Sequence, residues 1–324
     1  MKIIKKLIFV VAIAAIASCK KDPAIPVAEH YSSVSDFFSR NNVAMQTYTI
    51  DGSLGGSFTT PQGTIVSIPA NAFRTQSHVP VTGSVTIQFK DIYKKSDMLL
   101  SKMATQTSIG LPLKSGGEFF IKAIASDAAL ILDYGKKITI TQPAIRTGGI
   151  DNLNPQQPFL LGLDTSSLGP PANGWAPPAP DSIFAIDSVY TNAENYIFSL
   201  YQFNSPVDSG SWCNSDNASF FSAFPQTHLT LLPNDNISTY QTDVFLVFQS
   251  VSSMVHVYYD WSNNNFPYLY APQGLQCTLV AFGVKDGAPY SSFVPITIGA
   301  NQSVNFTLSP TNTNAFINHL EALN

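Results

Sequence analysis

The stretch SVTIQFKD, residues 84–91, decides the fold class. Its apolar residues Val85, Ile87 and Phe89 alternate with polar ones. Because successive side chains of an extended chain point to opposite faces, these three residues share one face. The run KKITITQ, which ends at residue 142, repeats the alternation. Such runs predict antiparallel strands with one buried face, and therefore an all-β fold.

The strand-like runs fall into two groups along the chain. We predict a first β-sandwich over residues 45–145 and a second β-rich domain over 183–324, where DVFLVFQS and QCTLVAFGV are two of the runs. Between the groups, SSLGPPANGWAPPAPDS (166–182) holds five prolines and two glycines. Proline cannot donate to a strand ladder, so we predict a Pro-rich connector over 146–182.

Two short helices are expected near the ends of the mature chain. Ser33 and Asp36 have the spacing of an N-terminal cap, within a tether and helix segment at 19–44. Phe316 and Leu320 are placed to bury one face of a terminal helix. The predicted architecture is thus two immunoglobulin-like β-sandwich domains, a connector and two short helices.

The first 18 residues have the features of a signal peptide. Three lysines precede Leu7–Ala17, an apolar run of eleven residues that is too short to span a bilayer. Ile16-Ala17-Ser18-Cys19 resembles the bacterial lipobox, which implies that Cys19 carries lipid chains and anchors the protein to the outer membrane. The alternative is an ordinary leader followed by an accidental cysteine.

The balance of charged residues limits which kinds of molecule the protein is expected to bind. The chain has 17 Lys and Arg against 21 Asp and Glu, a formal net charge of −4. It lacks the basic surface that nucleic acids require, so we expect no nucleic-acid partner. Charged residues make up only 12%, which favours a secreted protein with an uncharged polar surface.

Cys213 and Cys277 are the other two cysteines. In an oxidising compartment they can form a disulfide, which would stabilise the fold by roughly 4 kcal/mol on the chain-entropy model. Two buried free thiols are the equally weighted alternative.

Several stretches resemble uncharacterised envelope lipoproteins of Bacteroidota. GTIVSIPANAF (63–73), PVTGSVTIQFKDI (80–92) and SGGEFFIKA (115–123) are similar to their N-terminal β-sandwich, and more distantly to the ZU5 domain. The W-x-N-x-D pattern at 212–216 is also similar to the second half of those proteins. The resemblance implies a ZU5-like sandwich and a location in the outer membrane, and it implies no activity.

No catalytic motif is present. The sequence contains no H-E-x-x-H, C-x-x-C, P-loop or G-x-S-x-G pattern, and its five histidines are isolated. We therefore predict no catalytic residues, no cofactor and no metal. The oxygen-rich stretch DSGSWCNSDN (208–217) is interpreted as a structural turn rather than a calcium loop, and His256 is expected to face solvent.

One stretch indicates a ligand-binding surface. YYDWSNNNFPYLY (258–270) contains six aromatic residues, and rings beside amides suit a glycan or a protein. We predict a surface formed partly by Trp261, Tyr268 and Tyr270. The alternative is a hairpin whose rings alternate between core and rim.

Two Asp-Ser-aliphatic triplets suggest O-glycosylation at Ser182 and Ser188. Together these features predict a lipid-anchored envelope protein, on either face of the outer membrane, with a structural or binding role towards proteins or glycans. The alternative is a glycan or peptide hydrolase whose carboxylates meet only in the fold.

Overall fold

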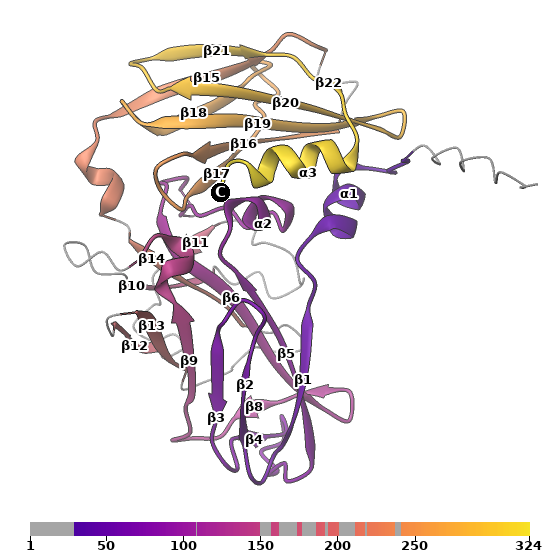
Figure 1. The fold of residues 1–324 in the computed structure, drawn as a ribbon, viewed down its shortest axis with the longest axis vertical. Coiled ribbons are helices and arrows are strands. Elements are labelled where there is room, and N and C mark those ends of the chain that lie inside the picture. The colour runs from indigo at the N-terminus through magenta and orange to yellow at the C-terminus, as the bar shows by residue number, and fades with distance from the viewer. Residues whose placement is uncertain are drawn as a thin grey trace, which may run out of the picture.

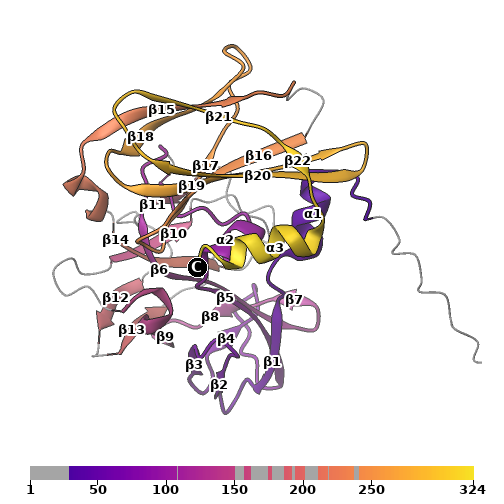
Figure 2. The ribbon, with the colours of Figure 1, turned by 45° about the horizontal axis from the view of Figure 1, so that its top comes forward.

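The computed structural model describes residues 29–107, 109–149, 157–161, 174–176, 186–191, 194–200, 211–217, 219–236 and 241–324. For 157–161, 176, 186–191 and 211 it describes the backbone alone. The strands form two facing pairs of sheets, and helices fill a layer between the pairs (Figure 1). The rotated view keeps the same order of layers (Figure 2). The fold is all-β with short helices, as the sequence predicts.

The first pair of sheets lies in the lower half of Figure 1. Its larger sheet contains, in spatial order, β1 (Gln46–Asp51), β5 (Ser84–Ile92), β6 (Lys114–Ala125), β14 (Ser211–Asn217), β10 (Gln157–Leu161) and β11 (Trp175–Ala176), and β7 (Ala128–Ala129) also pairs with β6. The facing sheet contains β12 (Ile186–Thr191), β13 (Asn195–Leu200), β9 (Ile138–Pro143), β3 (Ile65–Ile68) and β2 (Gly56–Thr59). A short ribbon of β4 (Phe73–Arg74) and β8 (Ile131–Leu132) lies beside them.

The second pair of sheets comes from the C-terminal part of the chain. One sheet contains β18 (Phe266–Pro272), β15 (Gln226–Pro233) and β21 (Gln302–Phe306). The other contains β17 (Met254–Val257), β16 (Gln241–Phe248), β19 (Gln276–Lys285), β20 (Ala288–Thr297) and β22 (Ser309–Pro310). Two short 3₁₀ helices, η1 (Ala144–Thr147) and η2 (Phe220–Ala223), connect strands.

Alternation along the strands builds the core of each pair. Val85, Ile87 and Phe89 of β5 have no exposed surface and pack with Ile138 and Ile140 of β9 between the first two sheets. The prediction that each group shares a buried face is confirmed. Phe306 and Leu308 contribute in the same way to the core of the second pair.

The central strands are buried on both faces. In β19, Leu279 points into the second core, whereas Val280 and Phe282 point into the helix layer. In β6, Phe119 and Phe120 divide in the same way between the first core and that layer. Burial on two sides explains why QCTLVAFGV is apolar without alternation.

Three helices occupy the middle layer: α1 (Val34–Asn41), α2 (Lys95–Leu100) and α3 (Thr313–Glu321). The predicted cap is confirmed, because Ser33 Oγ accepts a 2.9 Å hydrogen bond from the backbone N–H of Asp36. The terminal helix is confirmed as α3, and α2 was not predicted. None of the described helices is both long and apolar enough to cross a bilayer.

The predicted boundaries between domains differ from the observed ones. β13 pairs with β9 and β14 pairs with β6, so strands beyond residue 183 belong to the first pair of sheets. The predicted connector also supplies β10 and β11, and Trp175 of β11 is buried in the helix layer. Alternation identifies a strand but not its partner, so the sequence divided one sandwich into two groups.

Candidate functional site

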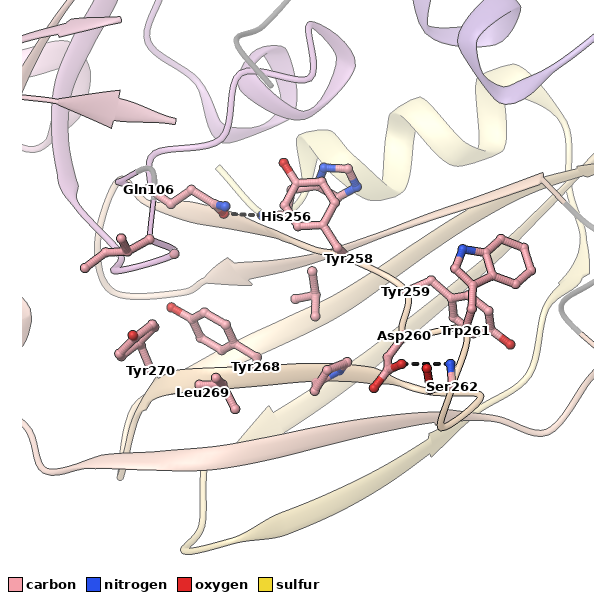
Figure 3. A pocket seen from close by; sticks show the side chains of 14 residues that line it. Gln106, His256, Tyr258, Tyr259, Asp260, Trp261, Ser262, Tyr268, Leu269 and Tyr270 are labelled. Atoms are coloured by element: carbon pink, nitrogen blue, oxygen red, sulfur yellow. Dashed lines mark hydrogen bonds between the residues drawn. The ribbon is translucent and has the colours of Figure 1, made fainter. Parts of the chain in front are cut away.

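A hollow of about 630 Å³ opens beside the segment that joins β17 to β18. All three residues of the predicted binding surface, Trp261, Tyr268 and Tyr270, line it. Gln106 and Gly110 contribute from the chain between α2 and β6, which lies across the hollow from Trp261 (Figure 3). We call this site the aromatic hollow.

A tight turn positions the outer wall of the aromatic hollow. The backbone N–H of Asp260 donates to Asn265 O at 2.8 Å, and the Asp260 carboxylate accepts from Ser262 N at 2.8 Å and from Asn263 Nδ2 at 2.7 Å. These hydrogen bonds, that from the Asn263 side chain above all, lower the pKa of Asp260. Asn264 has a φ of 58°, a left-handed conformation that asparagine tolerates. The asparagines between the aromatic residues therefore shape the turn.

The turn holds Trp261 out of the core. The Trp261 side chain is 78% exposed, and its ring packs edge-on against Tyr259 at 4.8 Å between centroids. Tyr259 in turn packs on the buried ring of Phe266 at 4.9 Å and bonds through its hydroxyl to Asn264. The Trp261 ring is thus exposed to solvent but held in position by Tyr259, which itself packs on the core. A large apolar ring held in this way is what is expected of a residue that contacts a ligand.

Tyr268 and Tyr270 differ from Trp261 in burial. Tyr268 is only 5% exposed and packs in the core of the second pair of sheets, so the core-and-rim alternative describes it well. Burial raises the pKa of Tyr268, and its hydroxyl has no hydrogen-bond partner among the described residues. Tyr270 is half-buried beside Gly110, whose φ of 89° suits glycine. Sequence reasoning found the residues but not this division of roles.

His256, which lines the aromatic hollow, is held in place by Asp243 and Lys102. His256 was expected to face solvent, but its side chain is only 16% exposed, and its ring lies between Phe245 and Tyr258 with centroids 4.7 and 4.5 Å away. His256 Nε2 lies 3.2 Å from Asp243 Oδ1, and Lys102 Nζ lies 2.8 Å from Asp243 Oδ2. Burial alone would raise the pKa of Asp243, but the hydrogen bond and charge of His256, together with Lys102, bring it down to about 2.

The partners of His256 come from distant parts of the chain. Gln106 Oε1 accepts a 2.7 Å hydrogen bond from the His256 backbone N–H (Figure 3), and Asp243 lies on the neighbouring strand β16. No local sequence signal joins these positions. His256 Nε2 faces a carboxylate, and no described Ser or Thr hydroxyl bonds to the imidazole. The contacts of His256 therefore suit a residue that holds the wall of the hollow in place better than one that activates a nucleophile.

The two remaining cysteines are free thiols in different cores. Cys213 packs between the first two sheets and Cys277 between the second two, and both are fully buried. The disulfide alternative is therefore not realised, because the helix layer separates the two cores. Burial raises the pKa of both thiols, that of Cys277 to about 12, so neither is a reactive thiolate.

The W-x-N-x-D stretch is a strand rather than the predicted turn. It forms β14, where Asn214 pairs with Glu118 of β6. Glu118 and Asp216 have no exposed surface. Burial raises the pKa of both carboxyls, and for Glu118 the charge of Asp216 adds to the effect. None of the carboxyl oxygens of Glu118 and Asp216 has a hydrogen-bond partner among the described residues. The nearby side chains of Ser115 and Asn214 offset only part of the rise that burial causes in the pKa of Asp216.

Three predicted modification sites cannot be placed by side chain. Cys19 and Ser182 lie outside the described residues, and Ser188 belongs to β12, whose backbone alone is described. Among the described residues, no three His, Cys, Asp or Glu side chains gather closely enough to hold a metal ion.

A scan against protein families finds no match to this chain, and a search of curated proteins finds none either.

Proposed function

We propose that this protein is a lipid-anchored, non-enzymatic component of the bacterial outer membrane that binds a glycan at the aromatic hollow. The observation that carries the proposal is the exposed, supported ring of Trp261 at the rim of a 630 Å³ hollow. The C–H face of a sugar packs on such a ring, and nearby amides and hydroxyls, here Gln106 and Ser262, suit its hydroxyl groups. A protein side chain is the second ligand class that fits the same surface.

Replacement of Trp261 by Ala should weaken glycan binding by about tenfold or more, because a stacked ring contributes about 1.5 kcal/mol or more to such contacts. The free energy of unfolding should change by less than about 0.5 kcal/mol, since the ring is 78% exposed. A glycan array identifies a ligand for the native protein, and calorimetry then compares the affinities.

Tyr134→Ala is the matched control. Tyr134 is 95% exposed but lies on the first pair of sheets, away from the aromatic hollow, so its removal should leave binding unchanged. Equal affinities of the native protein and the Trp261→Ala variant would remove the proposal, as would a native protein that retains no glycan.

The anchor has its own test. Replacement of Cys19 by Ser should abolish labelling by radioactive palmitate and move the protein from the membrane fraction to the soluble fraction, because the lipid chains supply the attachment. Cys213→Ser is the control, since that thiol is buried in the fold. Labelling that persists without Cys19, or depends on Cys213, contradicts a lipid anchor at Cys19.

A hydrolase remains the second candidate because Glu118 and Asp216 lie on neighbouring strands with raised pKa values. Against it, both are fully buried, and neither lines a described hollow. Hydrolysis of glycans by the purified protein that disappears in Glu118→Gln would establish this candidate in place of the binding role.

A further inference from the structure

A second hollow, of about 290 Å³, lies where the two pairs of sheets meet. Its cations come from three separate segments: Lys94 and Lys95 at the start of α2, Lys114 at the start of β6, and Arg146 in η1. The loop at 249–252 closes another side. No described Asp or Glu side chain lines this cationic hollow, in a chain whose acidic residues outnumber its basic ones.

Lys95 is the buried charge of the cationic hollow. It is only 6% exposed, and its Nζ donates to Phe248 O at 2.8 Å and to Gln249 O at 3.3 Å. The ammonium group has three N–H donors, so one is left over. No described carboxylate lies within ion-pair distance of Lys95. Burial lowers its pKa to about 8, which still leaves it mainly protonated at neutral pH.

A buried cation without a counter-ion is costly, and a bound anion would remove that cost. Two further groups, on Arg146 and Ser252, also have hydrogen-bonding capacity that an anion could use. Arg146 donates through Nε to Gln62 O at 3.0 Å, while its two terminal nitrogens have no hydrogen-bond partner among the described residues. Ser252 Oγ, also in the wall, is buried without a partner in the described part of the chain.

The other two cations of the hollow, Lys94 and Lys114, already contact other side chains. Lys94 Nζ pairs with Glu321 Oε2 at 3.2 Å on the exposed rim. Lys114 Nζ lies over the ring of Phe220, 5.2 Å from its centroid. Both can add to the positive potential of the hollow, whereas Lys95 and Arg146 have donors to offer an anion directly.

We propose that the cationic hollow binds a tetrahedral oxyanion, the phosphate or sulfate group of a small ligand, between Lys95 and Arg146. Arginine matches such groups with two parallel hydrogen bonds, and a buried lysine supplies a point charge. A volume of about 290 Å³ admits the anion with a small attached group. The cationic hollow shares no residue with the aromatic hollow, so this site stands independently of the glycan proposal.

Calorimetry on the purified protein, at constant ionic strength in chloride, tests the proposal with inorganic phosphate, inorganic sulfate and glucose 6-phosphate as probes. Saturable binding of phosphate or sulfate is expected. Lys95→Met and Arg146→Gln should each raise the dissociation constant by about tenfold or more, because each removes a charge-assisted hydrogen bond. Tighter binding of glucose 6-phosphate than of phosphate assigns the site to an ester, and the reverse order assigns it to the free ion.

Lys137→Gln is the matched control. It removes one exposed positive charge beside the opposite end of β9 from Arg146, and should change the dissociation constant by less than about twofold. If Lys95→Met does not fold, the exposed Arg146 still provides the test. Absence of saturable binding by either ion overturns the site, as does equal weakening by Lys137→Gln, which would indicate attraction to net charge alone.

Discussion

Replacement of Phe282 by Ala should lower the free energy of unfolding by about 3–5 kcal/mol, the loss measured for large aromatic residues removed from protein cores. Phe282 is fully buried on β19 and faces the helix layer. Its ring stacks on Phe37 of α1 at 4.0 Å between centroids and lies 4.6 Å from Phe316 of α3. The substitution thus empties the point at which both helices meet the second pair of sheets. Urea denaturation followed by fluorescence and circular dichroism measures the change.

Phe293→Ala is the control for ring loss at the edge of the same layer. Phe293 is only partly buried and contacts Phe316 at 5.6 Å, so a clearly smaller loss is expected. The Phe282 variant should also separate the unfolding of the two pairs of sheets into distinct transitions, because the shared layer couples them. A loss below about 1 kcal/mol with a single transition would show that the two pairs of sheets stay coupled without the Phe282 ring, and would contradict this prediction.

The free energy of unfolding should fall as pH rises above about 4, because Glu118 and Asp216 are buried with raised pKa values. Below that pH the folded and unfolded chains both hold these protons, and the contribution to stability is fully present. Above it, the unfolded chain releases the protons while the folded chain keeps them, until pH passes the folded pKa values. Each carboxyl that stays protonated costs about 1.4 kcal/mol per pH unit over that interval.

The double variant Glu118→Gln, Asp216→Asn should flatten this dependence and be more stable than the native protein at neutral pH, since amides of the same shape carry no proton to lose. Urea titrations between about pH 4 and 7 measure the slope. Asp127→Asn is the control: Asp127 is exposed at a φ of 61°, a conformation that asparagine accepts, so the native slope should remain. An unchanged slope in the double variant would assign the pH dependence to other groups.

The sequence predicted what depends on near neighbours in the chain. The alternation of Val85, Ile87 and Phe89 predicted a buried face, and Ser33 predicted the start of α1. It could not predict strand pairing. The paired strands β14 and β6 are about a hundred residues apart in the chain, and alternation of apolar residues does not indicate which strand a given strand pairs with. The apolar run of β19 carried a usable signal, since burial on both faces implies a layer on each side.

The candidate site divides in the same way. Trp261, Tyr268 and Tyr270 lie within ten residues of one another, and their density alone indicated a surface. Gln106 reaches the aromatic hollow from a remote segment, and Asp243 contacts His256 behind its wall from another; nothing in their local sequence marks either residue. Lys95 and Arg146 were not predicted as site residues for the same reason. The local sequence of a single cation does not show whether the fold places it near other cations or near a counter-ion.

The first described residues are fastened to the last helix. Glu29 Oε2 accepts hydrogen bonds from the backbone N–H and the hydroxyl of Thr313, both at 2.7 Å, and Tyr31 N donates to Gly287 O at 2.9 Å. Under the proposed anchor at Cys19, tension on the chain before Glu29 would act first on these hydrogen bonds and on the C-terminal sheets, and only then on β1. In a protein anchored in that way, the arrangement would protect the first pair of sheets from unfolding under mechanical force.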